Sequence, residues 1–313
     1  MNIEEVSKEQ YFKIVKHDYI FNAVAFNELN KYKVDELKYL LFNEKRYRFG
    51  LCVGIREGEV SCPFTAPFGS MVAIKKPVSV KHYDEAIAAL DTFMIKNKYK
   101  SIKFILPPMF YDETGLSIFI NILYRKGYSL KNIDLNFHFD LKNVSTNKYP
   151  EMILNNGRRN LRISLNSNLA LKHCDTDEEE KKAYKVIAEN RESNGYPLRM
   201  TFQQVIDTVK IIDHDSFLVM KDDEEIAAAL VYYVNEDAAQ VIYWGDRPGF
   251  REFKPINYLA YKLIHYYSEK GMKYLDIGPS TENSIPKFGL CDFKQSIGCD
   301  ISSKMTMVKT FFE

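Results

Sequence analysis

Gln240-Val-Ile-Tyr-Trp-Gly245 and Lys273-Tyr-Leu-Asp-Ile-Gly278 are the two short segments that decide the fold of this chain. Their β-branched and aromatic content predicts two strands. A helix is expected between them, over residues 255–270, and an apolar strand before them, over residues 226–234. The peptide at residues 289–298 is interpreted as a closing turn. The predicted order of strand, strand, helix, strand and turn is typical of an α/β protein.

The composition is that of an ordinary globular protein. The chain has 313 residues, of which 46% are apolar and 27% are charged, so it can build a sizeable core. This length fits one large domain or two of ordinary size. The net charge is +1, from 43 basic and 42 acidic residues, which gives no overall reason to expect a nucleic-acid or membrane partner.

Cysteine and histidine usage indicates a reducing compartment and no metal site. The number of cysteines, five, is odd, and no pair has the CxxC spacing of a zinc or redox site. The six histidines show no metal-ligand spacing. The N-terminus lacks a signal-peptide pattern, and no apolar run approaches the ~20 residues that cross a bilayer. We therefore expect a cytoplasmic protein without a membrane span.

The two halves of the chain are expected to share one plan. In the first half we expect helices at residues 8–16, 34–42, 80–97 and 114–126. Strands are expected there at residues 48–56, 59–64, 101–106 and 133–141. The second half predicts helices at 151–165, 175–192 and 202–212, a strand at 169–174, a hairpin at 216–234 and a last strand at 303–312. The polar segment 143–150 between them predicts domains 1–147 and 148–313. A tandem of two related folds is our hypothesis.

Five peptides carry a resemblance to a known family. They are Thr65-Ala-Pro-Phe-Gly-Ser70, Leu106-Pro-Pro-Met-Phe-Tyr111, Gly157-Arg-Arg-Asn-Leu-Arg162, Asp276-Ile-Gly278 and Phe293-Lys-Gln-Ser-Ile-Gly298. In this order and spacing they resemble the FemAB-like branch of the acyl-CoA N-acyltransferase (GNAT) superfamily. The resemblance implies a bacterial transferase with a mixed α/β sheet, built as two tandem acyltransferase-like domains. It places the donor cleft in the second domain.

Two departures from the family pattern concern the donor. No long helical hairpin of the kind that accompanies aminoacyl-tRNA use is visible, and the near-neutral charge gives no help for RNA binding. The Arg/Gln-x-x-Gly-x-Gly/Ala motif of acetyl-CoA enzymes is replaced by Arg247-Pro-Gly-Phe-Arg251 and Lys254-Pro255. We expect a CoA-linked acyl donor, and aminoacyl-tRNA remains the disfavoured alternative.

A donor site is expected where the two strands diverge, before the helix at 255–270. A helix N-terminus attracts phosphates through its free N–H groups and its dipole. Arg247, Arg251 and Lys254 precede that terminus, so their charge and the dipole agree. Gly249 and Trp244 lie in the same stretch and complete the predicted cofactor-binding set. A solvated basic loop is the alternative of equal weight.

Lys294, Asp276 and Tyr243 are the predicted catalytic residues. The resemblance places the lysine of Phe-Lys by the donor or acceptor, where a cation stabilises the developing oxyanion. We expect Lys294→Ala to lower turnover with little loss of fold; the alternative is a surface lysine on the last strand. Asp276 lies among apolar residues and could act as a base. Its alternative, a structural aspartate that caps the next turn, is slightly favoured.

Arg158, Arg159, Phe293 and Tyr111 form the predicted substrate-binding set. By resemblance, the arginine-rich helix faces the acceptor or a phosphate, whereas a solvated or salt-bridged face is at least as good a reading of the residues. The predicted function is N-acyl transfer from a CoA-type donor to an amine of a peptide, amino sugar or cell-wall precursor. Two alternatives stay open: an aminoacyl-tRNA-dependent peptidoglycan-bridge transferase, and a degenerate member that binds a small molecule without catalysis.

Overall fold

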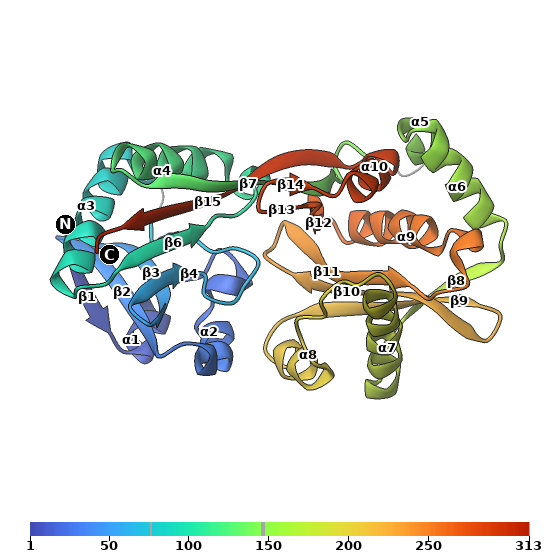
Figure 1. Ribbon diagram of the computed structural model, residues 1–313, viewed down its shortest axis with the longest axis horizontal. Helices are drawn as coiled ribbons and strands as arrows, with labels where there is room; N and C mark the ends of the chain where they lie inside the picture. The colour runs from blue at the N-terminus through green and yellow to red at the C-terminus, as the bar shows by residue number, and fades with distance from the viewer. Residues whose placement is uncertain (76, 145–147, 313) are drawn as a thin grey trace. The chain divides into compact units, whose positions relative to one another are not determined.

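A computed structural model describes residues 1–75, 77–144 and 148–312. The chain forms two compact units, one of Met1–Asp134 with the segment from Ser302 onward, the other of Leu135–Ile301. We call them unit 1 and unit 2 (Figure 1). The chain passes from unit 1 to unit 2 within strand β7 (Ser129–Asp140) and returns within strand β15 (Asp300–Thr310).

The sheet of unit 1 has the strand order β1-β2-β3-β4-β6-β15. Its strands besides β15 are β1 (Asn2–Val6), β2 (Glu36–Glu44), β3 (Arg46–Arg56), β4 (Glu59–Cys62), the short β5 (Val72–Ala73) and β6 (Ser101–Ile105). The first four form an antiparallel meander. Strand β6 then lies parallel to β4, and β15 lies antiparallel to β6.

Helices cover both faces of this sheet (Figure 1). They are α1 (Lys8–Ile14), α2 (Val24–Asn30), α3 (Val80–Lys96) and α4 (Glu113–Arg125), with short 3-10 turns at Ile20–Asn22, Lys31–Lys33 and Met109–Tyr111. Alternate residues of β2 point to opposite sides. Leu40 and Phe42 enter the core under α3 and α4, whereas Tyr39 and Leu41 enter a smaller core with Tyr11 of α1.

The sheet of unit 2 repeats this topology, in the order β8-β9-β10-β11-β12-β7. Its strands besides β7 are β8 (Leu169–His173), β9 (His214–Lys221), β10 (Glu224–Tyr233), β11 (Ala238–Asp246) and β12 (Tyr274–Pro279), with a separate hairpin of β13 (Thr281–Glu282) and β14 (Ile285–Pro286). Strands β8 to β11 form an antiparallel meander. Strand β12 is parallel to β11, and β7 is antiparallel to β12.

The helices of unit 2 also lie on both faces of the sheet. They are α5 (Tyr149–Met152), α6 (Asn155–Leu165), α7 (Asp177–Ser193), α8 (Phe202–Val209), α9 (Pro255–Glu269) and α10 (Phe288–Ser296). Helix α9 connects the parallel strands and packs on β8, β10 and β11, with α6 beside it. Helix α7 packs on the other face of β10 and β11 (Figure 1).

The matching topologies confirm the hypothesis of two related folds. In each unit an antiparallel meander of four strands precedes a parallel fifth strand, which is reached through a helix, and an antiparallel sixth strand. The sixth strand of unit 1 is the C-terminal β15, and that of unit 2 is β7 from the middle of the chain. The division into folding domains at 147/148 stays a prediction, because compactness in the folded state does not test independent folding.

The helix predicted at residues 34–42 is wrong, because this segment is strand β2. Its apolar residues repeat at a spacing that also suits a helix. Helices on both sides of the sheet bury the segment on both faces, which removes the alternation that normally marks a strand. Strand β1 was not predicted; it is a short edge strand and is largely exposed.

Two further differences concern unit 2. The closing turn predicted at residues 289–298 is helix α10, which ends before Gly298 at a φ of +86°. A glycine at this position is a common helix stop. The helix predicted at 151–165 is two helices, α5 and α6, separated at Ile153 and Leu154.

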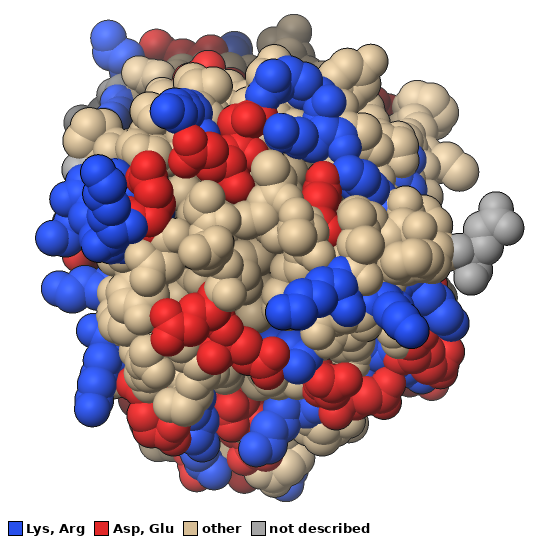
Figure 2. Space-filling view, turned by 90° about the vertical axis from the view of Figure 1, so that its left-hand side faces the viewer, with Lys and Arg blue, Asp and Glu red and all other residues tan. Residues whose placement is uncertain are grey.

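Charges are mixed on the face of the molecule that Figure 2 shows. Basic and acidic side chains alternate there with uncharged surface, and no field of a single sign covers the view. This distribution agrees with the net charge of +1. Within the described ranges, no helix is long and apolar enough to cross a membrane.

Replacing Gly157 by alanine is expected to lower the free energy of unfolding by about 1–3 kcal/mol. A Cβ atom at this position of α6 would lie 2.0 Å from the carbonyl oxygen of Ser296, at the end of α10. Gly289→Ala is the matched control, because a Cβ there meets nothing within 4 Å. It should be neutral or stabilise by up to about 1 kcal/mol. Urea unfolding of both variants checks this, and equal effects would contradict it.

Candidate functional site

The parallel strands β11 and β12 separate after only three paired positions. Their register ends at Gln240 opposite Asp276, although β11 continues to Asp246 and β12 to Pro279. Beyond this point, the backbone groups that face the gap lack a neighbouring strand. We call residues 241–246 and 277–279 the splay of unit 2. Since buried backbone groups need hydrogen-bond partners, side chains or a ligand must supply them here.

Asp276 fastens the strands where the splay begins. Its side chain is fully buried. The carboxylate accepts hydrogen bonds from Asn136 Nδ2 at 2.7 Å, Gln240 Nε2 at 2.8 Å and the Gly278 backbone N–H at 2.8 Å. The first two contacts join β12 to β7 and β11, and the third lies within β12 itself. The geometry therefore gives Asp276 a structural task, whereas its action as a base stays a prediction.

Lys294 supplies hydrogen bonds to the end of β12. It lies on α10, is 2% exposed, and its Nζ donates to the carbonyl oxygens of Ile277 at 2.8 Å, Gly278 at 2.8 Å and Pro279 at 3.2 Å. The surface lysine considered as its alternative is therefore wrong. Burial lowers the pKa of Lys294 to about 8. Because Lys294→Ala would leave three carbonyl oxygens without this donor, we now expect the variant to lose stability.

Arg191, which the sequence reasoning missed, lies close to the same place. It belongs to the last turn of α7, and its guanidinium is 5.3 Å from the ring centre of Tyr243 and 5.9 Å from that of Tyr196. Its Nε is buried and has no hydrogen-bond partner within residues 1–75, 77–144 and 148–312. Burial lowers the pKa of Arg191. Its repulsion with Lys294 also contributes to the lowered pKa of that lysine.

The end of α7 is positioned by Asn190 and Gly245. The Asn190 amide donates to the backbone oxygen of Asp246 at 2.8 Å and to its Oδ1 at 3.0 Å. A Cβ atom at Gly245 would lie 2.4 Å from the Asn190 side chain, so the close approach of α7 to β11 requires glycine there. Tyr243 is also predicted to be catalytic, and burial raises the pKa of its hydroxyl.

The predicted donor loop is partly engaged with the protein itself. Arg247 Nε lies 2.7 Å from Glu189 Oε2, and Arg251 donates to Asn194 Oδ1 at 2.9 Å. Gly249 has a φ of +93°, and a Cβ atom added to it would meet no other atom within 4 Å. These residues stay predictions for cofactor binding, and the two arginines would have to leave their present partners.

The N-terminus of α9 offers few free donors to a pyrophosphate. Lys254 caps it in a left-handed conformation with a φ of +53°, and its N–H donates to Arg251. The next residue, Pro255, has no N–H. The N–H groups of Asn257 and Tyr258 both point to the Lys254 carbonyl oxygen. The helix terminus that a CoA site needs is therefore poorly equipped for an anion.

The predicted substrate-binding residues are not all in one place. Phe293 is adjacent to Lys294, and its ring lies 6.4 Å from that of Trp244 in an edge-on contact. Arg158 donates to the backbone oxygens of Pro150 and Glu151 in α5 and of Ile153 at its C-cap, while Arg159 is exposed on α6.

Tyr111 belongs to unit 1. It stacks with Phe110 at 4.4 Å between ring centres and contacts the rings of Tyr19 and Phe68 at 5.6 and 4.8 Å. This surrounding aromatic cluster gives the residue a packing role. Its predicted part in substrate binding remains untested.

Unit 1 closes its own parallel pair differently. Strands β4 and β6 are paired up to Cys62 and Phe104. The following loop then returns, and the Gly69 N–H donates to the Ile105 carbonyl oxygen at 2.9 Å. Backbone thus occupies the place beside β6, whereas in unit 2 a single amine reaches the end of β12. The two units therefore differ at this place, and a working site in unit 2 stays a prediction.

Comparison with known proteins gives similarity in structure only. No protein-family model and no curated protein matches this sequence. Among solved structures, FemX matches 99% of this chain and 98% of its own, with a TM-score of 0.70 and 13% identity. The C-terminal domain of a putative lysylphosphatidylglycerol synthetase from Agrobacterium fabrum matches 97% of this chain and 93% of its own, with a TM-score of 0.64 and 10% identity.

A tandem GNAT protein from the clavulanic acid biosynthesis pathway matches as well. The alignment covers 88% of this chain and 83% of that protein, with a TM-score of 0.52 and 9% identity. The chain shares its fold with FemX and with this tandem GNAT protein. The predicted fold class of two tandem acyltransferase-like domains is thereby confirmed. Among the residues that the structure describes, no group of three or more His, Cys, Asp or Glu side chains is placed to hold a metal ion.

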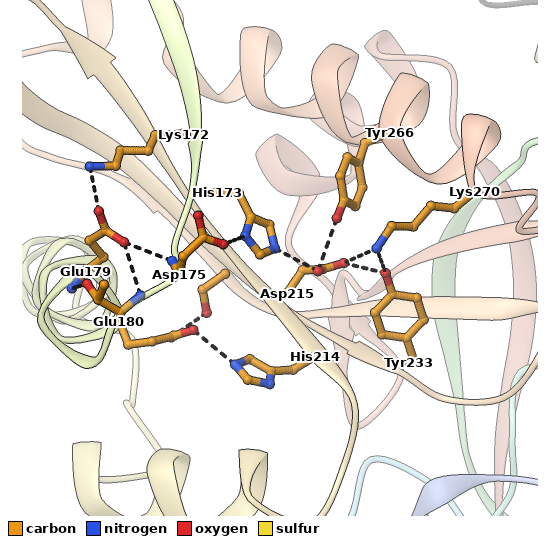
Figure 3. A network of polar contacts seen from close by, with 12 residues as sticks. Lys172, His173, Asp175, Glu179, Glu180, His214, Asp215, Tyr233, Tyr266 and Lys270 are labelled. Carbon is orange, nitrogen blue, oxygen red and sulfur yellow. Dashed lines mark hydrogen bonds and ion pairs between the residues drawn. The ribbon is translucent and has the colours of Figure 1, made fainter.

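A polar network centred on the buried Asp215 lies in unit 2 (Figure 3). Asp215 of β9 is 5% exposed and accepts hydrogen bonds from the hydroxyls of Tyr233 at 2.5 Å, Tyr267 at 2.9 Å and Tyr266 at 3.2 Å. Lys270 Nζ is 3.6 Å from the same carboxylate. Since Tyr266, Tyr267 and Lys270 belong to the last part of α9 and its C-cap, the network holds this helix against the sheet.

His173 extends the network toward solvent. Its Nε2 lies 2.8 Å from Asp215 Oδ1, and its Nδ1 lies 2.7 Å from Asp175 Oδ1 (Figure 3). Burial lowers the pKa of His173, but hydrogen bonds with Asp215 and Asp175 outweigh it, so the pKa lies above its usual value. For Asp215 the two effects have the opposite signs. Burial raises the pKa of this carboxyl, but hydrogen bonds from Tyr233, His173 and Tyr267 lower it by more, so the pKa lies below its usual value.

His173→Gln is expected to cost stability at acidic pH and less at alkaline pH. Because folding raises the pKa of His173, its protonated form stabilises the fold fully below the unfolded pKa of about 6.5 and loses this effect as pH rises through the folded pKa. The side chain is 38% exposed, so the difference should be below about 1 kcal/mol. Urea unfolding from pH 5.5 to 9 measures it.

His17→Gln is the control for this pH series. Burial lowers the pKa of His17, so the native form of that residue is stabilised as pH rises. Its difference from the wild type should therefore run in the opposite direction. A His173 difference that is constant over the whole range would contradict the assigned role.

Proposed function

We propose that this protein transfers an acyl or aminoacyl group to an amine at the splay of unit 2. The observation that carries the proposal is the pair of cations there. Lys294 Nζ is buried against the carbonyls of β12, and Arg191 has a buried Nε with no partner among the described residues. The names of the structural neighbours FemX and lysylphosphatidylglycerol synthetase, and the tandem GNAT fold, support the same class of reaction.

The chemistry begins when a neutral amine attacks the carbonyl carbon of an activated ester or thioester. A C–N bond forms, and negative charge develops on the carbonyl oxygen. Cations in a water-poor site stabilise this charge more than they do in water. When the tetrahedral intermediate collapses, the C–O or C–S bond breaks and the proton of the amine passes to the leaving group. Arg191 is the donor that we assign to the oxyanion, and Lys294, whose three N–H groups already donate to carbonyls of β12, contributes its positive charge.

The tyrosines near Arg191 explain how it can serve this role. Tyr243 and Tyr196 hold the guanidinium through their ring faces, which needs no carboxylate. A salt bridge would cancel its charge, whereas the aromatic contact leaves the Nε–H available. Trp244 and Phe293 provide apolar surface next to Lys294. Such surface excludes water and strengthens the electrostatic contacts.

For the donor, we extend the proposal to an ester carried by RNA. The predicted CoA donor depends on the loop at residues 247–254 and the terminus of α9. Arg247 is paired with Glu189, and the terminus presents few free N–H groups. An ester-linked aminoacyl group does not need a pyrophosphate site. The acceptor remains an amine of a peptide, an amino sugar or a cell-wall precursor.

Arg191→Ala should lower turnover about 100-fold, which is typical for the loss of one oxyanion donor. The assay is transfer of radiolabelled amino acid from aminoacyl-tRNA to a panel of amines. Arg56→Ala is the matched control, because Arg56 is exposed at the end of β3 in unit 1. Melting temperatures should stay unchanged in both. Equal activity of the two variants would refute the role of Arg191.

Lys294 is expected to set the alkaline limit of activity. Burial lowers its pKa to about 8, so kcat/KM should fall above that pH as the amine loses its proton. In Lys294→Arg this limb should move to higher pH, because arginine keeps its charge. An unchanged profile in a folded Lys294→Arg variant would show that another group titrates.

A binding experiment separates the donors and tests the non-catalytic alternative. Calorimetric titrations at low salt compare acetyl-CoA, free CoA and a short RNA acceptor stem that carries an amide-linked amino acid. Binding of the RNA alone supports the proposal. Micromolar binding of CoA that weakens in an Arg247→Ala, Lys254→Ala double variant would instead indicate a CoA-linked donor. Binding without transfer to any amine of the panel indicates a degenerate member.

A further inference from the structure

A hollow of about 320 Å³ opens on the sheet of unit 1. It is formed by β4, β6 and β15, by the first part of β7 and by the last described residues. Three lysines line it, Lys100, Lys103 and Lys131. We call this place the basic hollow. A volume of this size lies at the lower end of the range for small-molecule sites, roughly 300–1,000 Å³.

Strand register places polar residues in two rows on the floor of the basic hollow. Ser101 pairs with Glu59 on one side and with Thr310 on the other. Lys103 likewise pairs with Ser61 and Val308. Paired residues of neighbouring strands point to the same face of a sheet. The hydroxyls of three strands therefore gather around the Lys103 side chain.

The same alternation keeps this face separate from the core. Ile102 and Phe104, which alternate with Ser101 and Lys103 along β6, are fully buried in the main cluster of unit 1. Ser101 and Lys103 are half-buried, and Lys100 and Lys131 are exposed. The polar side of β6 is thus an accessible floor, and the hydrophobic core does not account for its residues.

Among the described residues, the lysines of the basic hollow have no ion-pair partner. In the described part of the chain, none of the three forms an ion pair, whereas Lys38, Lys126 and Lys309 of the same unit all pair with carboxylates at 3.0 Å or less. Glu59, the one acidic side chain in the lining, has no ion pair within that part either. The lining is therefore positively charged, with its cations available.

The backbone around Lys100 gives the basic hollow a fixed frame. Lys100 N–H donates to the Gly58 carbonyl oxygen at 2.9 Å, and the Lys100 carbonyl oxygen accepts from the N–H groups of Phe311 at 2.8 Å and Phe312 at 3.2 Å. The side chain of Phe312 lines the basic hollow and is 41% exposed. An aromatic ring therefore stands next to three cations and several hydroxyls.

We propose that the basic hollow binds a small phosphate-bearing molecule with a planar ring, of the nucleoside monophosphate type. The lysines and the hydroxyls of Ser61, Ser101 and Thr310 receive the phosphate, because cations and neutral donors together match its charge and its oxygens. Phe312 contacts the ring. With three lysines, the basic hollow suits a small anion better than a polyanion, whose binding needs an extended basic surface. This site is independent of the function proposed for unit 2.

The test is calorimetric titration of the full chain with inorganic phosphate and with adenosine monophosphate. Adenosine monophosphate should bind, and more tightly than phosphate. Lys103→Ala and Lys131→Ala should each weaken both ligands at least tenfold, and Phe312→Ala should weaken only the nucleotide. Lys131 is exposed, so its variant should fold even if Lys103→Ala does not. Lys185→Ala, which removes an exposed lysine of α7, is the matched control and should change nothing.

Three results would overturn the proposal. The first is no binding of either ligand at millimolar concentration. The second is binding that survives both lysine substitutions, which would place the site elsewhere. The third is binding of a 20-base-pair RNA duplex with no binding of the mononucleotide, which would make this face part of a polyanion surface. Equal affinity for phosphate and nucleotide would refute the contact of the ring with Phe312.

Discussion

Parallel strands that part before they end leave backbone groups without partners, and the rest of unit 2 is arranged around this constraint. An unpaired buried carbonyl costs free energy comparable to a lost hydrogen bond. Asp276 fixes the point at which β11 and β12 part, through donors from three strands. Lys294 then reaches three carbonyl oxygens beyond that point from α10. The same amine stabilises the structure and lies where the proposed chemistry needs a cation.

The two units show what the same topology does under different local sequences. In unit 1 the chain itself returns beside β6, and Gly69 completes the hydrogen bonding of Ile105. In unit 2 the equivalent place depends on one side chain. This difference is the physical reason for assigning the transfer reaction to unit 2.

Hydrogen bonds fasten helix α9 and the end of α7 to opposite faces of the unit 2 sheet. At one end of α9, Asp215 collects hydroxyls from α9 and β10 together with His173 of β8. On the other face of the sheet, Asn190 holds the last turn of α7 to Asp246. Arg191 follows directly in the chain and is placed by this contact. The network of Asp215 thus acts as a scaffold, whereas Arg191 is the cation to which we propose a catalytic role.

Most of the element order followed from local sequence, because the strands of the meanders and helix α9 have clear periods and Gly or Pro at their ends. The helix predicted at residues 34–42 was wrong because burial on both faces removed the alternation of apolar and polar residues that marks a strand. The stretch around Phe293 and Lys294 was recognised by resemblance, but its helical state and the burial of Lys294 depend on carbonyls from β12. Arg191 could not be found, because in sequence it looks like any charge on a solvated helix. The sequence determined the fold class through local patterns, and only the tertiary structure decided which cations meet, because their distances depend on how strands far apart in the chain pair.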